Sequence, residues 1–273
     1  MTTPLPYDMG NAGDLIKHGL LTEFCEWWLQ NHNGLFTFID PFGGRPYVSP
    51  PHGEVVRRVQ RLESCALTRA QPDIGHCYYG SGNVIKHSAL AVQRQAIVKI
   101  SDRDKTAFQE LIQAGFEAFH HKAFQRQESF SIIDCRLAAS SASLVLLDPY
   151  DDFLAEYAST IVPKLPEFIL ASGIPVALFV LCEDWDSESG LKWQGLKETY
   201  LAPKLIYLSL ACSKIPAGPV KGESRYHSEV ILLLPPGDDE VRLQNLVYRL
   251  QTFSELLGAV SGQRIRFQCS WVE

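Results

Sequence analysis

The residues best suited to chemistry lie in segment 144–153, LVLLDPYDDF, where an apolar, strand-like run ends in Asp148, Pro149 and Tyr150. A carboxylate and a backbone carbonyl at the mouth of a buried strand can accept hydrogen bonds from an amine, and the adjacent aromatic ring can stack on a flat base. Methylation of an exocyclic amine needs both kinds of group. Aspartate and proline are also common where a strand simply enters a turn, and for this segment taken alone the turn is the simpler interpretation.

Apolar runs typical of strands alternate with helical patterns along the chain. We expect helices at 15–30, with Asp14 as the N-cap, and at 105–119, 153–164, 191–200 and 239–257. We expect strands at 35–39, 96–100, 129–133, 144–147, 175–182, 205–212, 228–236 and 264–272. This alternation predicts an α/β fold with a mostly parallel sheet and helices on both faces. The 273 residues form one domain in this interpretation, with residues 50–95 as a small helical insertion.

Acids follow four successive predicted strands. They are Asp40, which precedes the glycine turn at Gly43 and Gly44, and then Asp102, Asp134 and Asp148. Ligands of open parallel sheets bind beyond the carboxyl ends of the strands, so we expect these acids to face one crevice.

Composition limits the function classes. Apolar residues make up 46% of the chain and charged residues 21%, and no apolar run is long enough to span a membrane. The start, MTTPLPYDMGNAGD, lacks the basic segment followed by an apolar segment that is typical of a signal peptide, so a cytoplasmic location is expected. Seven scattered cysteines without ligand spacing are interpreted as reduced core thiols, and no metal site is predicted.

A net charge of −6 gives no overall attraction to a phosphate backbone. Nucleic acid would therefore have to bind a local basic patch. Two candidates are the segment 120–126 and a helix whose arginines we expect to point outward, with Arg57, Arg58, Arg61 and Arg69. For either patch taken alone, a solvated helix face is the simpler explanation.

Several segments together resemble the RlmJ family, bacterial 23S ribosomal RNA adenine-N6 methyltransferases. The most specific is GNAGDLIKH at residues 10–18, which resembles the family's GNHADVLKH. In the same order follow IDPFGGRPY, GEVVRRVQRL, YYGSG, Asp134 with Cys135, Asp148 with Pro149 and Tyr150, and HSEVILLLPP. The resemblance covers nearly the whole chain.

The resemblance implies a Rossmann-like S-adenosylmethionine methyltransferase fold and gives each motif a role. Asp148 would be the catalytic acceptor, assisted by the Pro149 carbonyl, and Tyr150 would stack on a base taken out of its own stack. The residues expected to bind S-adenosylmethionine are Lys17, His18, Asp40, Gly43, Ser81, Asp102, Asp134, Cys135 and Asp148. Asp102 would hold the ribose and Asp134 the adenine of the cofactor. The partner would be nucleic acid, above all ribosomal RNA.

Two alternatives remain open. The chain has one proline before Tyr150 where the family has two, and DPFGG where the family has a GAG turn, which is consistent with a methyltransferase relative that binds a ligand without transferring methyl groups. A nucleic-acid hydrolase that holds Mg²⁺ with the strand-end acids is the third possibility.

Overall fold

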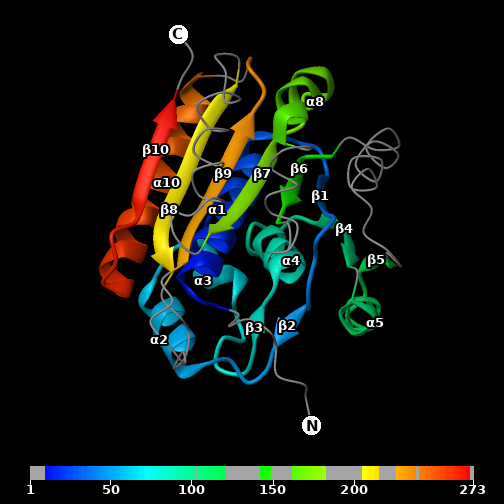
Figure 1. The fold of residues 1–273 in the computed structure, drawn as a ribbon, viewed down its shortest axis with the longest axis vertical. Helices are drawn as coiled ribbons and strands as arrows, with labels where there is room; N and C mark the ends of the chain where they lie inside the picture. The colour runs from blue at the N-terminus through cyan, green and yellow to red at the C-terminus, as the bar shows by residue number, and fades with distance from the viewer. Residues whose placement is uncertain are drawn as a thin grey trace.

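The computed structural model describes residues 10–102, 104–120, 142–148, 162–182, 205–214, 226–237 and 240–270 (Figure 1). The expected strand 129–133, the expected helix 191–200 and most of the expected helix 153–164 lie outside these ranges.

The fold is built on one eight-stranded sheet. Its strands are β1 (Phe36–Asp40), β4 (Ala96–Asp102), β5 (Glu117–His120), β6 (Leu144–Leu147), β7 (Val176–Cys182), β8 (Ile206–Lys214), β9 (Tyr226–Leu234) and β10 (Arg266–Ser270). Their order across the sheet is β10-β8-β9-β7-β6-β1-β4-β5. The helices are α1 (Ala12–Asn31), α2 (Gly53–Arg61), α3 (Ala66–Ala70), α4 (Ser81–Ala91), α5 (Lys105–Gln113), α8 (Leu165–Ser172), which follows the 3₁₀ turn η2 (Val162–Lys164), and α10 (Glu240–Ser261). A two-stranded ribbon joins β2 (Tyr47–Val48) to β3 (Tyr78–Tyr79).

Most of the strands run in the same direction. Strands β5, β4, β1, β6 and β7 are parallel neighbours, β9 is antiparallel to both β7 and β8, and β10 is antiparallel to β8. The chain passes from β1 to β4 on one side and later returns to place β6 on the other side of β1. The strand order therefore reverses at β1, and the crevice beyond the ends of β1 and β6 is where such sheets bind ligands.

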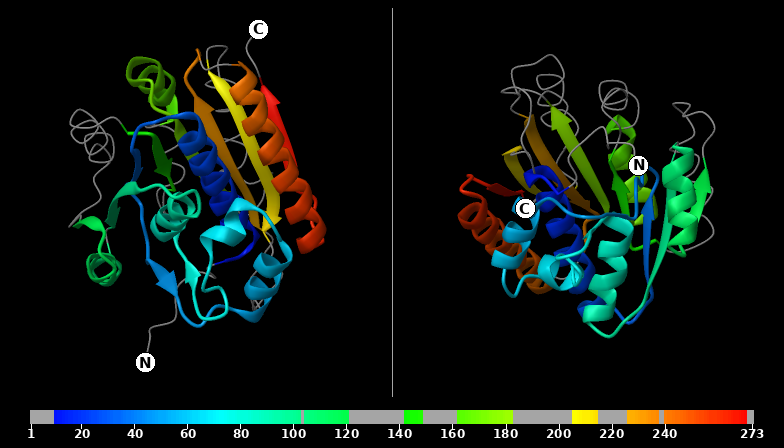
Figure 2. Two further views of the ribbon diagram at one scale, coloured as in Figure 1. Left: turned by 180° about the vertical axis from the view of Figure 1, so that it is seen from behind. Right: turned by 90° about the horizontal axis from the view of Figure 1, so that it is seen from below.

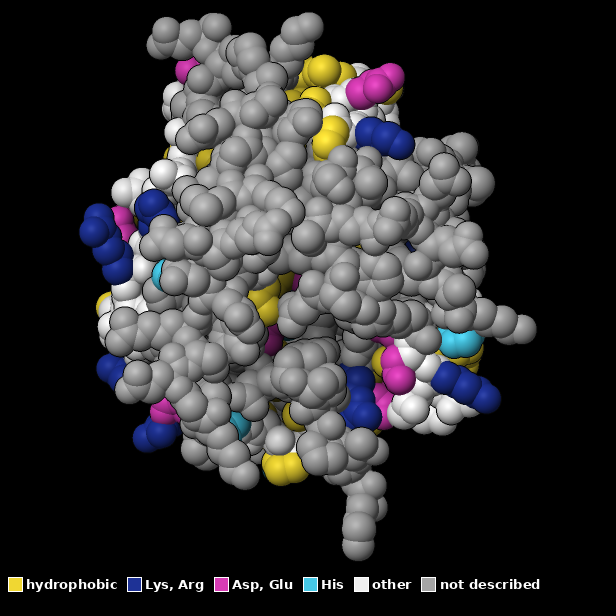
Figure 3. Space-filling view, viewed as in Figure 1, with side chains coloured by type: hydrophobic (Ala, Val, Ile, Leu, Met, Phe, Trp, Pro, Cys, Tyr) yellow, Lys and Arg dark blue, Asp and Glu magenta, His cyan; other side chains and the backbone are white. Residues whose placement is uncertain are grey.

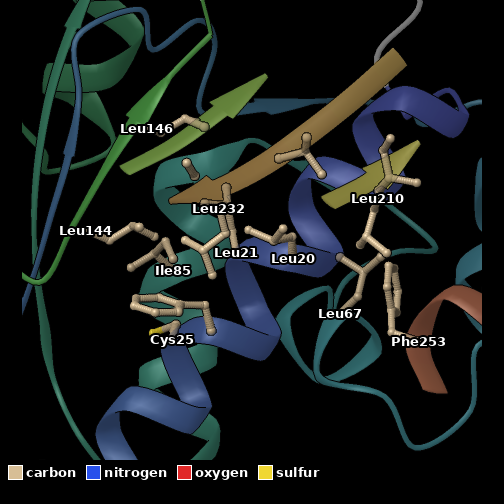
Figure 4. Close-up of a cluster of buried hydrophobic side chains, with 14 of the residues drawn as sticks. Leu20, Leu21, Cys25, Leu67, Ile85, Leu144, Leu146, Leu210, Leu232 and Phe253 are labelled. Carbon is tan, nitrogen blue, oxygen red and sulfur yellow. The ribbon is translucent and has the colours of Figure 1, made fainter. Parts of the chain in front are cut away.

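Each face of the sheet packs on its own hydrophobic core. Alternate residues of one strand belong to different cores, as Phe38 and Ile39 do, because successive side chains point to opposite faces. The larger core lies under α1, α4 and α10, where Leu21, Ile85 and Phe253 meet the sheet (Figure 4). The smaller core lies under α8, on the other side of the sheet (Figure 2). Three of the expected core thiols, Cys25, Cys65 and Cys212, are buried.

Helix α1 is enclosed on several sides. It packs on the sheet and on α3, α4 and α10 at once. Gly19 lies so close to α10 that an added Cβ would be 1.9 Å from Cζ of Phe253. Apolar residues accordingly occur all around this helix, which is the pattern of a buried helix rather than a surface helix.

The start of α1 differs from the prediction. Its N-cap is Asn11, not Asp14, and the Asn11 side chain accepts hydrogen bonds from the backbone N–H groups of Gly13 and Asp14. Asp14 instead lies in the first turn, where its Oδ2 accepts from the Gly10 N–H at 2.8 Å. Gly10 has a φ of +85°, which suits glycine far better than other residues. Part of the GNAGDLIKH motif therefore serves to begin the helix.

Two further expectations are wrong in detail. The helix expected at 105–119 ends at Gln113, and β5 follows after Gly115, whose φ of +74° ends the helical path. On α2, Arg58 does not point into solvent: it is 4% exposed, and its Nε lies 3.2 Å from Oε1 of Glu54.

Residues 45–79, with α2, α3 and the β2–β3 ribbon, lie beyond the carboxyl edge of the sheet (Figure 1). In Figure 1 the arrowheads of β7 and β8 point toward α2, α3 and the β2–β3 ribbon. Helix α4, the crossover from β1 to β4, packs on both strands and on α1, so it shares the main core. The helical insertion expected at 50–95 thus contains α2, α3, β3 and α4, and its status as a separate subdomain stays a prediction.

Among the described residues, no helix combines the length and the apolar character that a membrane span requires.

Candidate functional site

Three of the four expected acids lie at neighbouring strand ends. Asp40 ends β1, Asp102 ends β4, and Asp148 directly follows β6. Because β6, β1 and β4 are adjacent and parallel, their carboxyl ends meet at one edge of the sheet. The reversal of strand order at β1 places Asp40 and Asp148 at the position where ligands of such sheets bind.

Lys17 of α1 connects the GNAGDLIKH motif to Asp148. Its Nζ lies 2.6 Å from Oδ2 of Asp148 and 3.1 Å from Oδ1 of Asp14. The same ammonium lies 4.8 Å from the centre of the Phe179 ring. The Lys17 side chain is only 10% exposed, and that of Asp148 is 23% exposed. Lys17 therefore fixes the position of one carboxylate oxygen of Asp148 in a partly buried site.

Asp40 is the most deeply buried of these acids. Its Oδ2 accepts a hydrogen bond from Oγ of Ser81 at 2.5 Å, and its Oδ1 accepts from the Phe42 N–H at 3.1 Å. Burial raises the pKa of Asp40 to about 7, the negative charge of Asp148 acts in the same direction, and the bond from Ser81 opposes both. Near neutral pH this carboxyl is therefore close to half-protonated.

The raised pKa of Asp40 predicts a pH-dependent effect of Asp40→Asn. Between the ordinary pKa of 3.8 and about 7, the folded protein holds a proton that the unfolded chain has lost, so ionisation of Asp40 lowers the free energy of unfolding as pH rises. Asparagine has no such proton. We expect urea unfolding to show that the stability of Asp40→Asn relative to wild type rises by roughly 2 to 3 kcal/mol between pH 5 and pH 8.

Comparing the variant with wild type separates the effect of Asp40 on the pH dependence of stability from the effect of His18. Burial lowers the pKa of His18 to about 3, so His18 contributes the opposite slope, a loss of stability as pH falls below 6.5, in both proteins. Glu255→Gln, at an exposed position of α10, is the matched control. Parallel stability curves for Asp40→Asn and wild type would contradict the prediction.

The glycine turn after β1 is fastened to the end of β4. The Gly43 N–H donates to the Ser101 carbonyl at 2.9 Å, and a Cβ on Gly43 would lie 2.4 Å from Cγ2 of Ile100. The Gly44 N–H donates to Oδ2 of Asp102 at 2.7 Å. Backbone packing thus explains why glycine is needed here, and Asp102 holds the turn in place.

Asp102 is more constrained than the ribose-binding prediction assumed. It is 2% exposed, and its second oxygen, Oδ1, accepts from the Asp104 N–H at 2.6 Å. Both carboxylate oxygens therefore already bind backbone N–H groups. The ribose contact stays a prediction.

His18 lies beside Tyr78 rather than among the acids. Its Nδ1 is 2.7 Å from the Tyr78 hydroxyl, the two rings stack at 5.5 Å, and the residue is 2% exposed. With its pKa lowered to about 3, His18 is neutral at physiological pH. The predicted contact of His18 with a cofactor stays a prediction.

Four of the expected site residues, Asp134, Cys135, Pro149 and Tyr150, lie outside the described residues. Conversely, the sequence interpretation missed Asp14, Gly44 and Tyr78 as site residues. The spacing of Asp14 and Lys17 by three positions on a helix was a readable signal for their ion pair. The bonds of Gly44 to Asp102 and of Tyr78 to His18 depend on tertiary packing and had no such signal.

Charges do not form one uniform surface on the face shown in Figure 3. Basic and acidic side chains of the described residues are intermixed around its margin. Over the described ranges, no group of three or more His, Cys, Asp or Glu side chains is arranged to hold a metal ion.

A pocket of about 690 Å³ lies at the opposite edge of the sheet. It is lined by residues at or before the amino ends of the strands, including Thr37, Ser143 and Pro175, and by Trp28 and His32 at the end of α1. None of the predicted site residues lines it. We therefore place the candidate site at the carboxyl edge, where the acids and Lys17 meet.

No protein-family model matches this chain, and no curated protein matches it in sequence. Among solved structures, the chain is similar to protein LPL1258 from Legionella pneumophila strain Philadelphia 1, of family DUF519. The TM-score is 0.61 and the sequence identity 14%, over 97% of this chain and 98% of that chain. The likeness shows the fold, and the predicted class, α/β and Rossmann-like with a mostly parallel sheet covered on both faces, is confirmed.

Two structures of the plantazolicin methyltransferase BpumL are more distant. The complex with SAH has a TM-score of 0.35, and the complex with a monoazolic desmethylPZN analog and SAH has 0.36. Each is 10% identical, over 80% of this chain and 84% of that chain. TM-scores this low do not indicate a shared function.

Proposed function

We propose that this chain is an S-adenosylmethionine-dependent methyltransferase of the RlmJ kind, which transfers methyl groups to adenine N6 in ribosomal RNA or another nucleic acid. One observation carries the proposal. Lys17 of GNAGDLIKH and Asp148 of the DPY segment are 131 positions apart in the sequence. Nζ of Lys17 nevertheless lies 2.6 Å from Oδ2 of Asp148, at the edge of the sheet where the strand order reverses. The two residues belong to the segments that most suggested amine methylation, and their contact supports the proposal that both segments serve one site.

The residues present suit such a cofactor. S-adenosylmethionine supplies an electrophilic methyl group on a positively charged sulfur and also carries an ammonium group. Asp148, and Asp40 when it is ionised, bring negative charge to the position where these cations would lie. Gly43 lets the turn after β1 pack tightly against Ile100 of β4, where a side chain would collide, and so keeps the turn beside the strand ends. Lys17, Asp40, Ser81, Asp102, Asp134 and Cys135 are proposed to surround the cofactor.

In this proposal, the residues of the chain promote methyl transfer by positioning the substrate amine. Asp148 accepts a hydrogen bond from the exocyclic amine, and Lys17 holds its carboxylate in one orientation. Pro149 would offer a second acceptor and Tyr150 a stacking surface. Orientation of this kind can supply much of the rate.

Two measurements, made one after the other, test the proposal. Isothermal titration calorimetry with S-adenosylmethionine should give a heat of binding that Asp134→Ala weakens. Incubation of the protein with unmodified ribosomal RNA and isotope-labelled cofactor should then yield N6-methyladenine, detected by mass spectrometry of nucleosides. Absence of cofactor binding would refute the proposal.

The other two functions give different results in the same experiments. Cofactor binding without transfer to any RNA would identify a binding protein of this fold that has lost activity. RNA cleavage that depends on a divalent cation and needs no cofactor would identify a hydrolase.

A further inference from the structure

The β2–β3 ribbon carries aromatic rings at the edge of the candidate site. Residues that alternate along a strand point to opposite sides, and here Tyr78 points inward to His18 while Tyr79 is partly exposed. Tyr47, which pairs with Tyr79 across the ribbon, is 49% exposed. The ribbon runs directly into the site, because Gly80 and Ser81 follow Tyr79 and Ser81 binds Asp40.

Several contacts hold the Tyr79 ring in place. The ring stacks on that of His87 of α4, with centroids 4.7 Å apart and an angle of 8° between the planes. The Tyr79 hydroxyl donates to Asp73. The Gln71 side chain binds the Tyr79 backbone twice, accepting from its N–H at 2.8 Å and donating to its carbonyl at 3.0 Å. A ring fixed in this way loses little rotational freedom when a ligand stacks on it.

The charge of this region differs from that of the rest of the chain. Segment 45–91 contains six Lys or Arg residues and three Asp or Glu residues, a formal charge of +3 in a chain of −6. The remainder of the chain therefore carries −9. Arg57 and Arg61 of α2 are exposed in this segment. Glu110 and Glu26, which lie outside the segment, pair with Arg45 and Arg69 and balance part of this positive charge. The exposed aromatic rings are therefore the stronger indication, because bases of single-stranded nucleic acid stack on such rings.

We propose that the ribbon face formed by Tyr47, Tyr79 and His87 is a stacking platform for bases of single-stranded RNA next to the nucleotide that enters the site. This inference rests on the proposed function and extends it to the way the substrate is held. Bases stack on aromatic rings without much sequence preference, so the platform would orient the strand while the crevice selects the target base.

The test measures binding of a fluorescein-labelled, single-stranded oligoribonucleotide by fluorescence anisotropy. We expect Tyr47→Ala and Tyr79→Ala each to raise the Kd about 5-fold or more. Tyr79→Phe keeps the ring, loses the bond to Asp73 and should bind nearly as wild type. Tyr248→Ala is the matched control, since Tyr248 is a 69% exposed tyrosine on α10, outside the ribbon.

Steady-state methyl transfer gives the second readout. Because the ribbon does not touch the reacting atoms in this proposal, both alanine variants should raise KM for RNA and leave kcat within about 2-fold. Wild-type binding by both alanine variants would overturn the platform while leaving methyl transfer intact. A wild-type protein that binds S-adenosylmethionine but no RNA would overturn the platform together with the nucleic-acid part of the proposed function, and cofactor binding would stand.

Discussion

Asp148→Asn should lower the rate of methyl transfer about 100-fold or more. Asparagine keeps the shape of the side chain but removes its negative charge, so both the bond to the Lys17 ammonium and the acceptor for the substrate amine are weakened. The rate should be measured in single turnovers with RNA and saturating S-adenosylmethionine, so that weaker cofactor binding does not enter the result.

Two further variants sharpen this experiment. Lys17→Met leaves Asp148 charged but without the ammonium 2.6 Å away, and it should also slow transfer. Because the two residues act through the same contact, the double variant should be little slower than Asp148→Asn alone. Glu255→Gln on α10 should retain wild-type activity. A rate for Asp148→Asn within about 3-fold of wild type would remove Asp148 from the mechanism.

Glu26→Gln should lower the free energy of unfolding by about 1.5 to 3 kcal/mol. Glu26 of α1 has a side chain only 2% exposed and binds two guanidinium groups, with Arg69 Nη2 at 2.6 Å and Arg249 Nη2 at 3.0 Å. Arg249 also binds Glu23 of α1 at 2.8 Å. The network joins α1 to α3 and α10. Glutamine removes the carboxylate that Arg69 and Arg249 share, and Arg249 keeps only its bond to Glu23.

A solvent-exposed ion pair of the same chain provides the control. Arg57 pairs with Glu54 on α2, but the Arg57 side chain is 72% exposed. Arg57→Gln should therefore change the free energy of unfolding by less than about 1 kcal/mol. Urea unfolding of both variants at one pH measures the difference, and equal midpoints would show that burial of Glu26 does not matter to stability.

The strands could be predicted from the sequence because each is a short apolar run that ends in polar residues. This held for β1, β4, β6, β7, β8 and β9, whereas β10, RFQCS, shows the alternation of polar and apolar residues typical of an edge strand. The error at α5 came from treating Phe116 as the next residue of a helical pattern and overlooking Gly115, which ends the helix. At the start of α1, two good capping residues three positions apart, Asn11 and Asp14, competed, and the interpretation chose the wrong one.

The place of the candidate site residues in the fold was easier to predict than their contacts. Acids at strand ends pointed to the crevice, and the structure brings Asp40, Asp102 and Asp148 to one edge. The pairing of Lys17 with Asp148 could not be predicted, because it depends on β6 lying next to β1, and sequence order alone does not fix that neighbour. The pKa shift of Asp40 similarly arises from burial by segments distant in sequence.

The enclosure of α1 has a consequence for affinity. Lys17 and Asp14 belong to a helix packed on the sheet and on three other helices, so their backbone is already ordered before any ligand arrives. The conformational entropy of these residues is lost when the protein folds and not when a ligand binds. A ligand that binds this end of the helix therefore keeps more of its interaction energy as affinity than it would at an equally charged loop.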